Sequence, residues 1–239
     1  MKEKNRDRSL KTRKHHVSYL FIPLSSLLFF SIGFMPFVGF VYVIMRFLPL
    51  DGILFYLLLP FFICIGLYFL IVSQMFLSSL LIRLFHLYYE AGSYDYDTNE
   101  KNALKWMIFA TVYTPLRKIL EIVPMGEFKI KYLRLMGMKI GNNSLIGGVI
   151  KDPCVTSFGS HSTMGEYAII YGHIHNYEKK TISIDPVSVG NNCVIGAGAI
   201  VMPGAIIEDN VNVAAGALVT KKQRLISGNT YVGIPAKKK

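Results

Sequence analysis

Two long apolar runs dominate the first third of the chain. Residues 17–45 and 52–82 contain no Asp, Glu, Lys or Arg. About 20 apolar residues in a helix cross the hydrocarbon core of a bilayer, so each run is long enough for one tilted span. Helices of soluble proteins average only about 11 to 12 residues. Because Pro49 interrupts the segment between the runs, the pattern predicts two transmembrane helices forming a hairpin over residues 17–86.

The segment before the first run is a basic tail. Residues 1–16 hold seven Lys or Arg and two acidic residues. Positive charge beside a span tends to stay on the cytoplasmic side, so both termini are expected in the cytoplasm. A secretory signal has a shorter apolar region, and the second run follows too closely for cleavage. We therefore expect an integral protein of the cell membrane, with membrane lipid as a partner and its C-terminal part in the cytoplasm.

Residues 102–123 have a different pattern, in which apolar residues recur at helical spacing and three Lys or Arg residues interrupt them. This pattern is typical of an amphipathic helix in the headgroup layer of a membrane, or of a helix that packs on a soluble domain. Pro115 is expected to kink or split the helix. We assign residues 87–137 to interfacial amphipathic helices and a linker.

The period changes after residue 137. Apolar residues recur at multiples of six in two series, and Gly or another small residue often follows them. The first series is Ile140, Ile146, Phe158, Met164 and Ile170, and the second is Val189, Ile195, Val201, Ile207, Val213 and Val219. A six-residue repeat is the pattern of a hexapeptide β-helix, in which one aliphatic side chain per short strand points inward. Residues 138–239 are therefore predicted to form a hexapeptide-repeat solenoid.

The register of this repeat is predicted to break once, between Ile170 and Val189, whose separation is three hexads plus one residue. Residues 171–186 are therefore predicted to leave the coil. An insertion in a solenoid tends to lie on its functional face. This one contains His173 and His175, two of the six histidines in the chain.

Composition and charge narrow the class of protein. The chain is 52% hydrophobic and 17% charged, which excludes a disordered chain, and its 20 glycines have no three-residue period, which excludes a collagen-like one. A formal net charge of +11 is expected to reflect anionic lipid and the positive-inside bias, with no nucleic acid as partner. Three cysteines without a CxxC motif indicate neither a disulfide framework nor a thiolate metal site.

The repeat sequence resembles a known family. The segments VGNNCVIGAGAIVMPGAII, AAGALVTK and VGIPAK resemble the hexapeptide-repeat acyltransferases of left-handed parallel β-helix fold, and the resemblance covers about residues 140–239. Upstream, LKWMIFATVYTPLRKIL and KYLRLMGMKIG are similar to the membrane-embedded C-terminal region of ε-poly-lysine synthetase and related proteins. The expected fold is thus a membrane α-helical hairpin plus a left-handed parallel β-helix.

The resemblance implies a histidine base. In such acyltransferases a histidine at the start of an inserted loop takes the proton of the acceptor, and imidazole suits this role because its pKa is near neutrality. Solenoid phase favours His173, whereas the His-x-x-Glu spacing of the poly-lysine synthetase region favours His175. Glu178 is the expected orienting carboxylate. A histidine that only packs in the loop remains the alternative for one of the pair.

The resemblance also implies a site for acetyl-CoA or another acyl-CoA. Small side chains on successive coils, including Ala199 and Ala217, leave room for a pantetheine arm. The positions that match the CoA site of the family are Ala197, Ala215, Thr220 and Lys221. Lysines 221, 222 and 237–239 are expected near the CoA phosphates. Packing in a tight solenoid explains the small residues equally well.

Together these observations predict a membrane-anchored acyltransferase that moves an acyl group, expected to be acetyl, from CoA to a hydroxyl or amine of a sugar, lipid-linked or amine acceptor. Related proteins close the donor groove with a neighbouring subunit, so a homotrimer is expected. Three alternatives stay open. They are amide formation from an aminoacyl thioester on a carrier protein, a γ-class carbonic anhydrase with zinc on His161, His173 and His175, and a non-catalytic trimeric scaffold. For the leading hypothesis no metal is expected.

Overall fold

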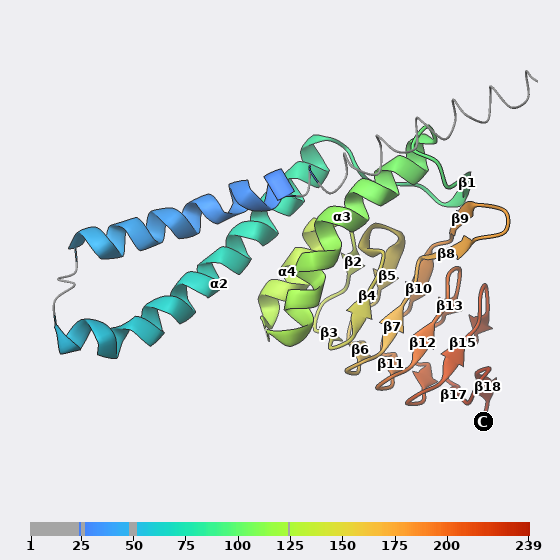
Figure 1. Ribbon diagram of the computed structural model, residues 1–239. Helices are drawn as coiled ribbons and strands as arrows, with labels where there is room; N and C mark the ends of the chain where they lie inside the picture. The colour runs from blue at the N-terminus through green and yellow to red at the C-terminus, as the bar shows by residue number, and fades with distance from the viewer. Residues whose placement is uncertain (1–23, 25–26, 48–51, 124) are drawn as a thin grey trace, which may run out of the picture. The chain divides into compact units, whose positions relative to one another are not determined.

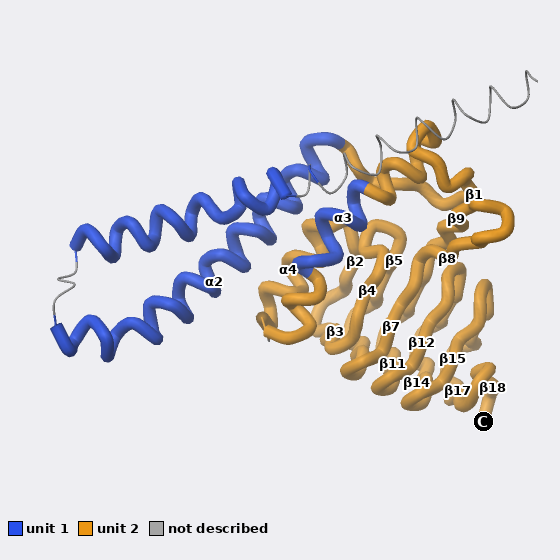
Figure 2. The backbone as a smooth tube through the Cα atoms, in the orientation of Figure 1, with its two compact units in different colours: residues 1–85, 108–116 blue, residues 86–107, 117–239 orange. Residues whose placement is uncertain are grey.

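The computed structural model describes residue 24 and residues 27–47, 52–123 and 125–239. They fall into two compact units (Figure 2). Unit 1 contains residues up to Phe85 together with Ile108–Leu116, and unit 2 contains His86–Met107 and Arg117–Lys239. The predictions made for the basic tail of residues 1–16 and for Pro49 lie outside the described residues.

Unit 1 is built around two apolar helices, Leu27–Phe47 and α2 (Ile53–Leu84). By length and composition, each could cross a membrane. Polar side chains of α2 bond to the backbone of the other helix: Gln74 Nε2 donates to the carbonyl of Phe30 over 2.9 Å, and Ser73 Oγ donates to that of Gly33 over 3.2 Å. Such bonds are typical of helices that pack closely in lipid, where polar groups need internal partners.

Two further helices precede the repeats, α3 (Lys101–Ile122) and α4 (Glu127–Leu135). Of the two outcomes expected at Pro115, a kink or a split, the split is wrong, because α3 continues through the proline. Tyr113 and Leu116 beside it are 2% and 1% exposed, and this burial offsets the hydrogen bond that a proline cannot donate. The ammonium of Lys129 on α4 donates to the carbonyls of Gly147 and Gly148 in the first coil.

Residues 139–238 form a solenoid of three parallel faces (Figure 1). The first face contains β2 (Lys139–Ile140), β5 (Thr156–Phe158), β10 (Val187–Val189), β13 (Ile206–Ile207) and β16 (Arg224–Leu225). The second contains β3 (Leu145–Ile146), β6 (Thr163–Met164), β11 (Val194–Ile195), β14 (Asn212–Val213), β17 (Thr230–Val232) and the antiparallel β18 (Lys237–Lys238). The third contains β4 (Val149–Ile150), β7 (Ile169–Ile170), β12 (Ile200–Val201) and β15 (Leu218–Val219). This arrangement is consistent with a left-handed parallel β-helix.

The predicted inward positions fill the interior. Partners on neighbouring coils are three hexads apart in sequence, as in the pairing of Ile195 with Val213 and of Val201 with Val219. The described members of both series are at most 3% exposed, except Ile140 in the first strand. Fully burying one aliphatic side chain contributes about 1.5 to 3 kcal/mol, so each member of the column stabilises the solenoid.

The predicted excursion is present. Phe158 pairs with Val189, so these partners are separated by far more than the usual three hexads. The additional residues form the hairpin of β8 (His173–Asn176) and β9 (Thr181–Ile184), which projects from one corner of the solenoid (Figure 1). β1 (Gly92–Asp95), from the segment before α3, pairs antiparallel with β9 and completes a three-stranded sheet.

The repeat also breaks at a second place, so the prediction of a single break is wrong. Ile150 pairs with Ile170, which is more than three hexads away, and a short 3₁₀ turn (Pro153–Val155) follows β4. Position 152 is the hexad position at which the first series lacks an apolar residue, and it holds Asp152.

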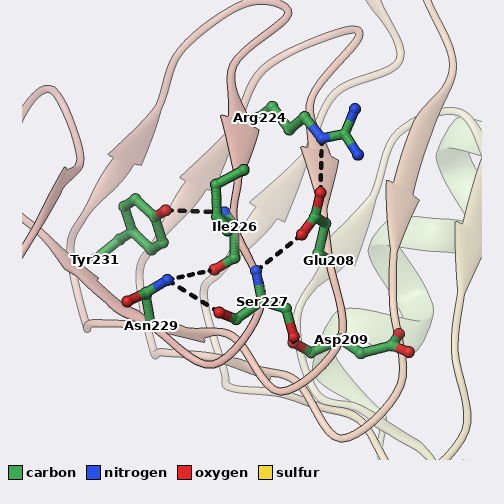
Figure 3. A network of polar contacts seen from close by, with 7 residues as sticks. All are labelled: Glu208, Asp209, Arg224, Ile226, Ser227, Asn229 and Tyr231. Carbon is green, nitrogen blue, oxygen red and sulfur yellow. Dashed lines mark hydrogen bonds and ion pairs between the residues drawn. The ribbon is translucent and has the colours of Figure 1, made fainter.

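A network of polar contacts links neighbouring turns of the last coils (Figure 3). The carboxylate of Glu208 accepts hydrogen bonds from Arg224 Nε (2.6 Å) and from the backbone N–H of Ser227 (2.9 Å). The N–H of Ser227 and the side chain of Arg224 keep the pKa of Glu208 below its ordinary value. The hydroxyl of Tyr231 accepts from the N–H of Ile226 over 2.8 Å, so side chains satisfy backbone groups at the turn after β16.

Candidate functional site

A buried carboxylate is the centre of the candidate site. Asp152 is 1% exposed, and four donors surround it. Oδ2 accepts from the backbone N–H of Gly172 over 2.8 Å and lies 2.7 Å from Nδ1 of His173. Oδ1 accepts from the hydroxyl of Tyr89 over 2.8 Å and from the indole N–H of Trp106 over 3.2 Å. A buried carboxylate is tolerated only with such partners, so this one is fully satisfied.

The charge of Asp152 is maintained by these partners. Burial alone raises the pKa of the carboxyl, but the hydrogen bond and electrostatic interaction with His173 and the hydrogen bonds from Tyr89 and the N–H of Gly172 outweigh it and lower the pKa below its ordinary value. The pKa of Tyr89 is raised well above its usual value by burial first and then by the charge of Asp152, so its hydroxyl keeps its proton and donates. The site therefore holds an ionised carboxylate away from water.

His173 lies where β8 begins, and its side chain is 16% exposed. Since Asp152 is ionised, Nδ1 of His173 carries the hydrogen of their contact and Nε2 is the atom that can take a proton. This is the arrangement by which a carboxylate orients a histidine base. The ring of Trp106 packs edge-on against the imidazole, with ring centroids 4.6 Å apart.

His175 lies further along β8, on the same face of the hairpin as His173. Its ring centroid is 5.3 Å from that of His173, 5.1 Å from that of Trp106 and 4.9 Å from that of Tyr96. Burial first, and then the neighbouring His173, lower the pKa of His175, so this imidazole is held neutral. It contacts His173 through the rings, whereas the imidazole that meets the carboxylate of Asp152 is that of His173.

Glu178 is exposed in the turn between β8 and β9. The expectation that it orients His173 is wrong, because Asp152 accepts the hydrogen bond from Nδ1. The reason is topological. The start of β8 carries His173 to Asp152, which is buried just after β4, whereas the turn carries Glu178 away from it.

The residues expected to hold the donor lie on two corners beside the third face. Ala197 and Ala215 are exposed on successive coils just before β12 and β15, and the N–H of Gly216 bonds to the carbonyl of Ala197. Thr220 and Lys221 follow β15, on the corner from which the excursion leaves. The ammonium of Lys221 is 3.2 Å from the carboxylate of Asp185.

Two other alanines were assigned to the wrong side of the coil. Ala199 is 0% exposed and Ala217 is 1% exposed, so both face the interior and cannot line a donor groove. Each follows a glycine with φ of 68°, Gly198 or Gly216. The left-handed glycine turns the backbone at the corner. The alanine before it is therefore exposed and the alanine after it faces the interior.

A cleft of about 660 Å³ lies on the outer side of the first face, and Asp185 and Lys222 are among its lining residues. Lys139, Ser157 and Ser188 supply part of its polar lining. His173 and His175 are not among the lining residues. The cleft adjoins the site through Val155, whose methyl group approaches Gly172.

A zinc centre on three histidines finds no support in the described residues. Within residues 27–47, 52–123 and 125–239, no group of three His, Cys, Asp or Glu side chains could hold a metal ion. His161 lies exposed on a tight turn with φ of 55°. His173 and His175 are the two members of the proposed ligand set that lie together.

Sequence reasoning missed Asp152, Tyr89 and Trp106. Asp152 had a signal in the sequence, because the hexad series skips position 152, and a carboxylate where the period predicts a buried side chain needs a partner. The other two had none. Tyr89 and Trp106 lie 63 and 46 residues before Asp152, in a segment predicted to be linker and interfacial helix.

Comparison with known proteins gives one family model and several relatives. The model described as bacterial transferase hexapeptide (six repeats) matches residues 186–221. Delta-poly-L-ornithine synthetase of Acinetobacter baumannii (strain AB307-0294) is 25% identical over 132 residues, which cover 54% of this chain and 8% of that protein. Mitochondrial gamma carbonic anhydrase 2 of Arabidopsis thaliana is 32% identical over 82 residues, which cover 34% of this chain and 24% of that protein. The chain therefore spans less than a quarter of the length of either relative.

Solved structures are similar to about half of the chain. A hexapeptide-repeat-containing acetyltransferase from Vibrio cholerae O1 biovar eltor, in complex with acetyl coenzyme A, has 17% sequence identity and a TM-score of 0.44. This match covers 51% of this chain and 80% of that chain. From the family model and the strand register, the chain carries a hexapeptide-repeat domain similar to those of bacterial transferases.

Proposed function

We propose that this protein is a membrane-anchored acyltransferase in which His173 is the general base and acyl-CoA, expected to be acetyl-CoA, is the donor. The observation that carries the proposal is the contact of 2.7 Å between His173 Nδ1 and the buried Asp152. The hexapeptide-repeat match at residues 186–221 supports transferase chemistry, and the solved acetyltransferase of this repeat type is described as bound to acetyl coenzyme A.

In the proposed step, Nε2 of His173 takes the proton from the acceptor hydroxyl or amine as that atom attacks the thioester carbonyl. Asp152 stabilises the imidazolium that forms. The tetrahedral intermediate then collapses, the C–S bond breaks, and the leaving thiolate takes the proton back from His173. The products are the acylated acceptor and free CoA, and the base returns to its starting state.

For the donor we propose the two corners beside the third face. Ala197 and Ala215 leave the backbone open on successive coils, and Thr220 and Lys221 lie on the corner of the excursion. Lys221 and Lys222 both reach Asp185, at 3.2 and 3.6 Å, and both are at least 38% exposed, so a phosphate could exchange with this carboxylate.

For the setting we propose a membrane surface and a trimer. The two apolar helices have the length to anchor the chain, and the basic N-terminal tail favours a cytoplasmic repeat domain. Ile169, Ile200 and Leu218 form an outward, half-buried apolar row on the third face, which suits contact with a second copy. Native mass spectrometry in detergent tests this, and a stable monomer would contradict it.

The chemistry is tested with the full-length protein in detergent, acetyl-CoA, and a panel of sugar and amine acceptors, by following thiol release. His173→Ala should lower kcat roughly 100- to 10,000-fold, the usual contribution of a positioned base. Acetyl-CoA binding should persist. His175→Ala should cost less, because the carboxylate of Asp152 contacts His173 instead. Full activity of His173→Ala would remove the proposal.

A second function is favoured by the similarity to the poly-ornithine synthetase. The same base would serve amide formation from an aminoacyl thioester on a carrier protein. Release of carrier thiol from an aminoacylated carrier, with no turnover of acetyl-CoA, would select this function. Stoichiometric zinc that is lost in both His173→Ala and His175→Ala would instead select anhydrase chemistry, in line with the similarity to the plant protein.

A further inference from the structure

The site of unit 2 is not made by the solenoid alone. Residues 86–107, which follow the second apolar helix, supply β1 to the sheet that carries His173, and they supply Tyr89 and Trp106 to the carboxylate of Asp152. Tyr89 is 4% exposed. Two of the four donors on Asp152 therefore come from outside the repeats.

These two donors act on one oxygen. Both the Tyr89 hydroxyl and the Trp106 indole N–H bond to Oδ1, whereas Gly172 and His173 occupy Oδ2. Because Tyr89 and Trp106 both donate to Oδ1, rotation of the carboxylate plane would break both of these hydrogen bonds. The oxygen that faces His173 is thus fixed, and with it the tautomer and orientation of the imidazole.

Resting on the proposed function, we propose that Tyr89 and Trp106 are positioning residues of the active site, and that residues 86–107 complete the base of the repeat domain. They do not touch the reacting atoms. They hold Asp152 ionised and oriented, and Asp152 in turn orients His173. The segment that joins the apolar helices to the repeats therefore sets the basicity of the site.

Several titratable groups surround the dyad. They are Tyr89 and Cys154 beside Asp152, His175 and Tyr171 beside His173, Tyr96 beside His175, and Lys151, whose charge interacts with Asp152. Burial raises the pKa of Cys154 to about 12, so this thiol stays neutral. Removal of a donor from Oδ1 leaves the carboxylate less stabilised, so the dyad, titrating as a pair, should take up its proton at higher pH.

The chain offers a readout that needs no acceptor. Trp106 is its one tryptophan, and its ring lies 4.6 and 5.1 Å from the rings of His173 and His175. A protonated imidazole in contact with indole quenches its fluorescence. Tryptophan emission of the full-length protein in detergent, followed against pH, therefore reports protonation of the site.

Tyr89→Phe should move the midpoint of this titration to higher pH. It should also lower kcat with acetyl-CoA roughly 10- to 100-fold, the worth of one hydrogen bond to a charged group, and move the acidic limb of the pH–rate profile in the same direction. Trp106→Phe removes the fluorophore, but it should lower kcat and shift the same limb. The KM for acetyl-CoA should stay unchanged in both.

Tyr88→Phe is the matched control, because the neighbouring hydroxyl donates to the backbone carbonyl of Leu135 over 3.1 Å and not to Asp152. It should leave the titration and kcat as they are. Circular dichroism establishes that each variant is folded. If Tyr89→Phe does not fold, Trp106→Phe carries the activity test by itself.

The outcomes separate the two proposals. If His173→Ala is inactive while Tyr89→Phe and Trp106→Phe behave like Tyr88→Phe, the positioning role is overturned and the acyltransferase proposal stands. If His173→Ala keeps full activity, the acyltransferase proposal falls. A uniform loss of activity in Tyr89→Phe, with neither the emission midpoint nor the acidic limb moved, indicates a structural role only and also overturns the inference.

Discussion

The regular coils of residues 187–231 and the irregular region around β8 differ in what their short strands bury. The first buries apolar side chains, whereas the second surrounds a buried carboxylate. In the regular coils the paired inward side chains are apolar, and partners recur every three hexads. In the irregular region Ile150 takes the paired apolar position, Asp152 is buried two residues after it, and the coil lengthens to include a hairpin with His173 and His175. The uninterrupted apolar column belongs to the first region, and the candidate chemistry belongs to the second.

The comparison shows how a solenoid accommodates a buried charge. A carboxylate inside the apolar column would lose its hydration without compensation. Here it lies where two breaks in the repeat meet, and groups from the turn, the hairpin and residues 86–107 replace the lost water. Four predictions test this division, from the largest expected effect to the smallest.

The largest effect is expected at the buried carboxylate of the irregular region. Asp152→Asn keeps the size of the side chain, but its amide cannot hold His173 in the tautomer that leaves Nε2 free. We expect kcat with acetyl-CoA to fall by roughly 1,000- to 10,000-fold, as for the orienting carboxylate of a triad. Asp209→Asn is the control, an exposed carboxylate bonded to the backbone N–H of Asn191. Equal kcat in the two variants would show that Asp152 has no part in the reaction.

The regular coils should respond in stability and not in chemistry. Ile195→Ala removes a side chain that is 0% exposed and should lower the free energy of unfolding by about 2 to 5 kcal/mol. Val194→Ala, its neighbour in β11, is 46% exposed and should change it by about 0.5 kcal/mol or less. Thermal unfolding followed by circular dichroism measures both. A loss of kcat in folded Ile195→Ala at low temperature would erase the distinction between the two regions.

The irregular region should also make the protein acid-sensitive. Both His175 and Asp152 have a lowered pKa in the folded protein, so the unfolded chain binds more protons, and stability falls as pH drops. The contribution of His175 to the free energy of unfolding is fully present above pH 6.5, its ordinary pKa, and is lost as pH falls through its pKa in the folded protein. The contribution of Asp152 is lost in the same way below pH 3.8, its ordinary pKa. His175→Gln should flatten the dependence of melting temperature on pH below 6.5. His161→Asn, at an exposed turn, should not flatten it.

The smallest effect is expected at the tip of the hairpin. Glu178→Gln removes an exposed carboxylate and should change kcat by about twofold or less, the usual range for a surface substitution. The variant compares Glu178, the carboxylate predicted from the sequence to orient a histidine, with Asp152, the carboxylate that contacts His173 in the structure. A loss as large as that of Asp152→Asn would mean that the hairpin rearranges during the reaction and brings Glu178 to a histidine.

Much of the fold could be predicted because it depends on local period. Six-residue spacing identified the inward positions from Val189 to Val219, and the break in that spacing located the hairpin. Lengths of apolar sequence identified the two long helices. The continuity of α3 through Pro115 was not predictable in this way, since it depends on the burial of the side chains beside the proline.

The candidate site could be predicted only in part. His173 and His175 were found because the break in the repeat pointed to them, and the structure places both on one strand. The roles of these two residues stay predictions. The carboxylate was assigned to Glu178, which is near in sequence, instead of Asp152, which lies 21 residues before His173. Spacing along the chain describes a strand or a turn, but it does not describe which coil lies beside it.

The sequence by itself thus determined three features of this protein: the apolar helices, the inward column of the solenoid and the point at which the chain leaves the coil. Each follows from the pattern of apolar and polar residues along one segment. Only the tertiary structure decided what surrounds the imidazole. Asp152 receives hydrogen bonds from residues 63, 46, 21 and 20 positions away, and these meet because β1 pairs with the hairpin and the first turns of α3 lie beside it. A buried carboxylate is stabilised by whichever donors lie within hydrogen-bond distance, and the packing of the elements decides which donors these are.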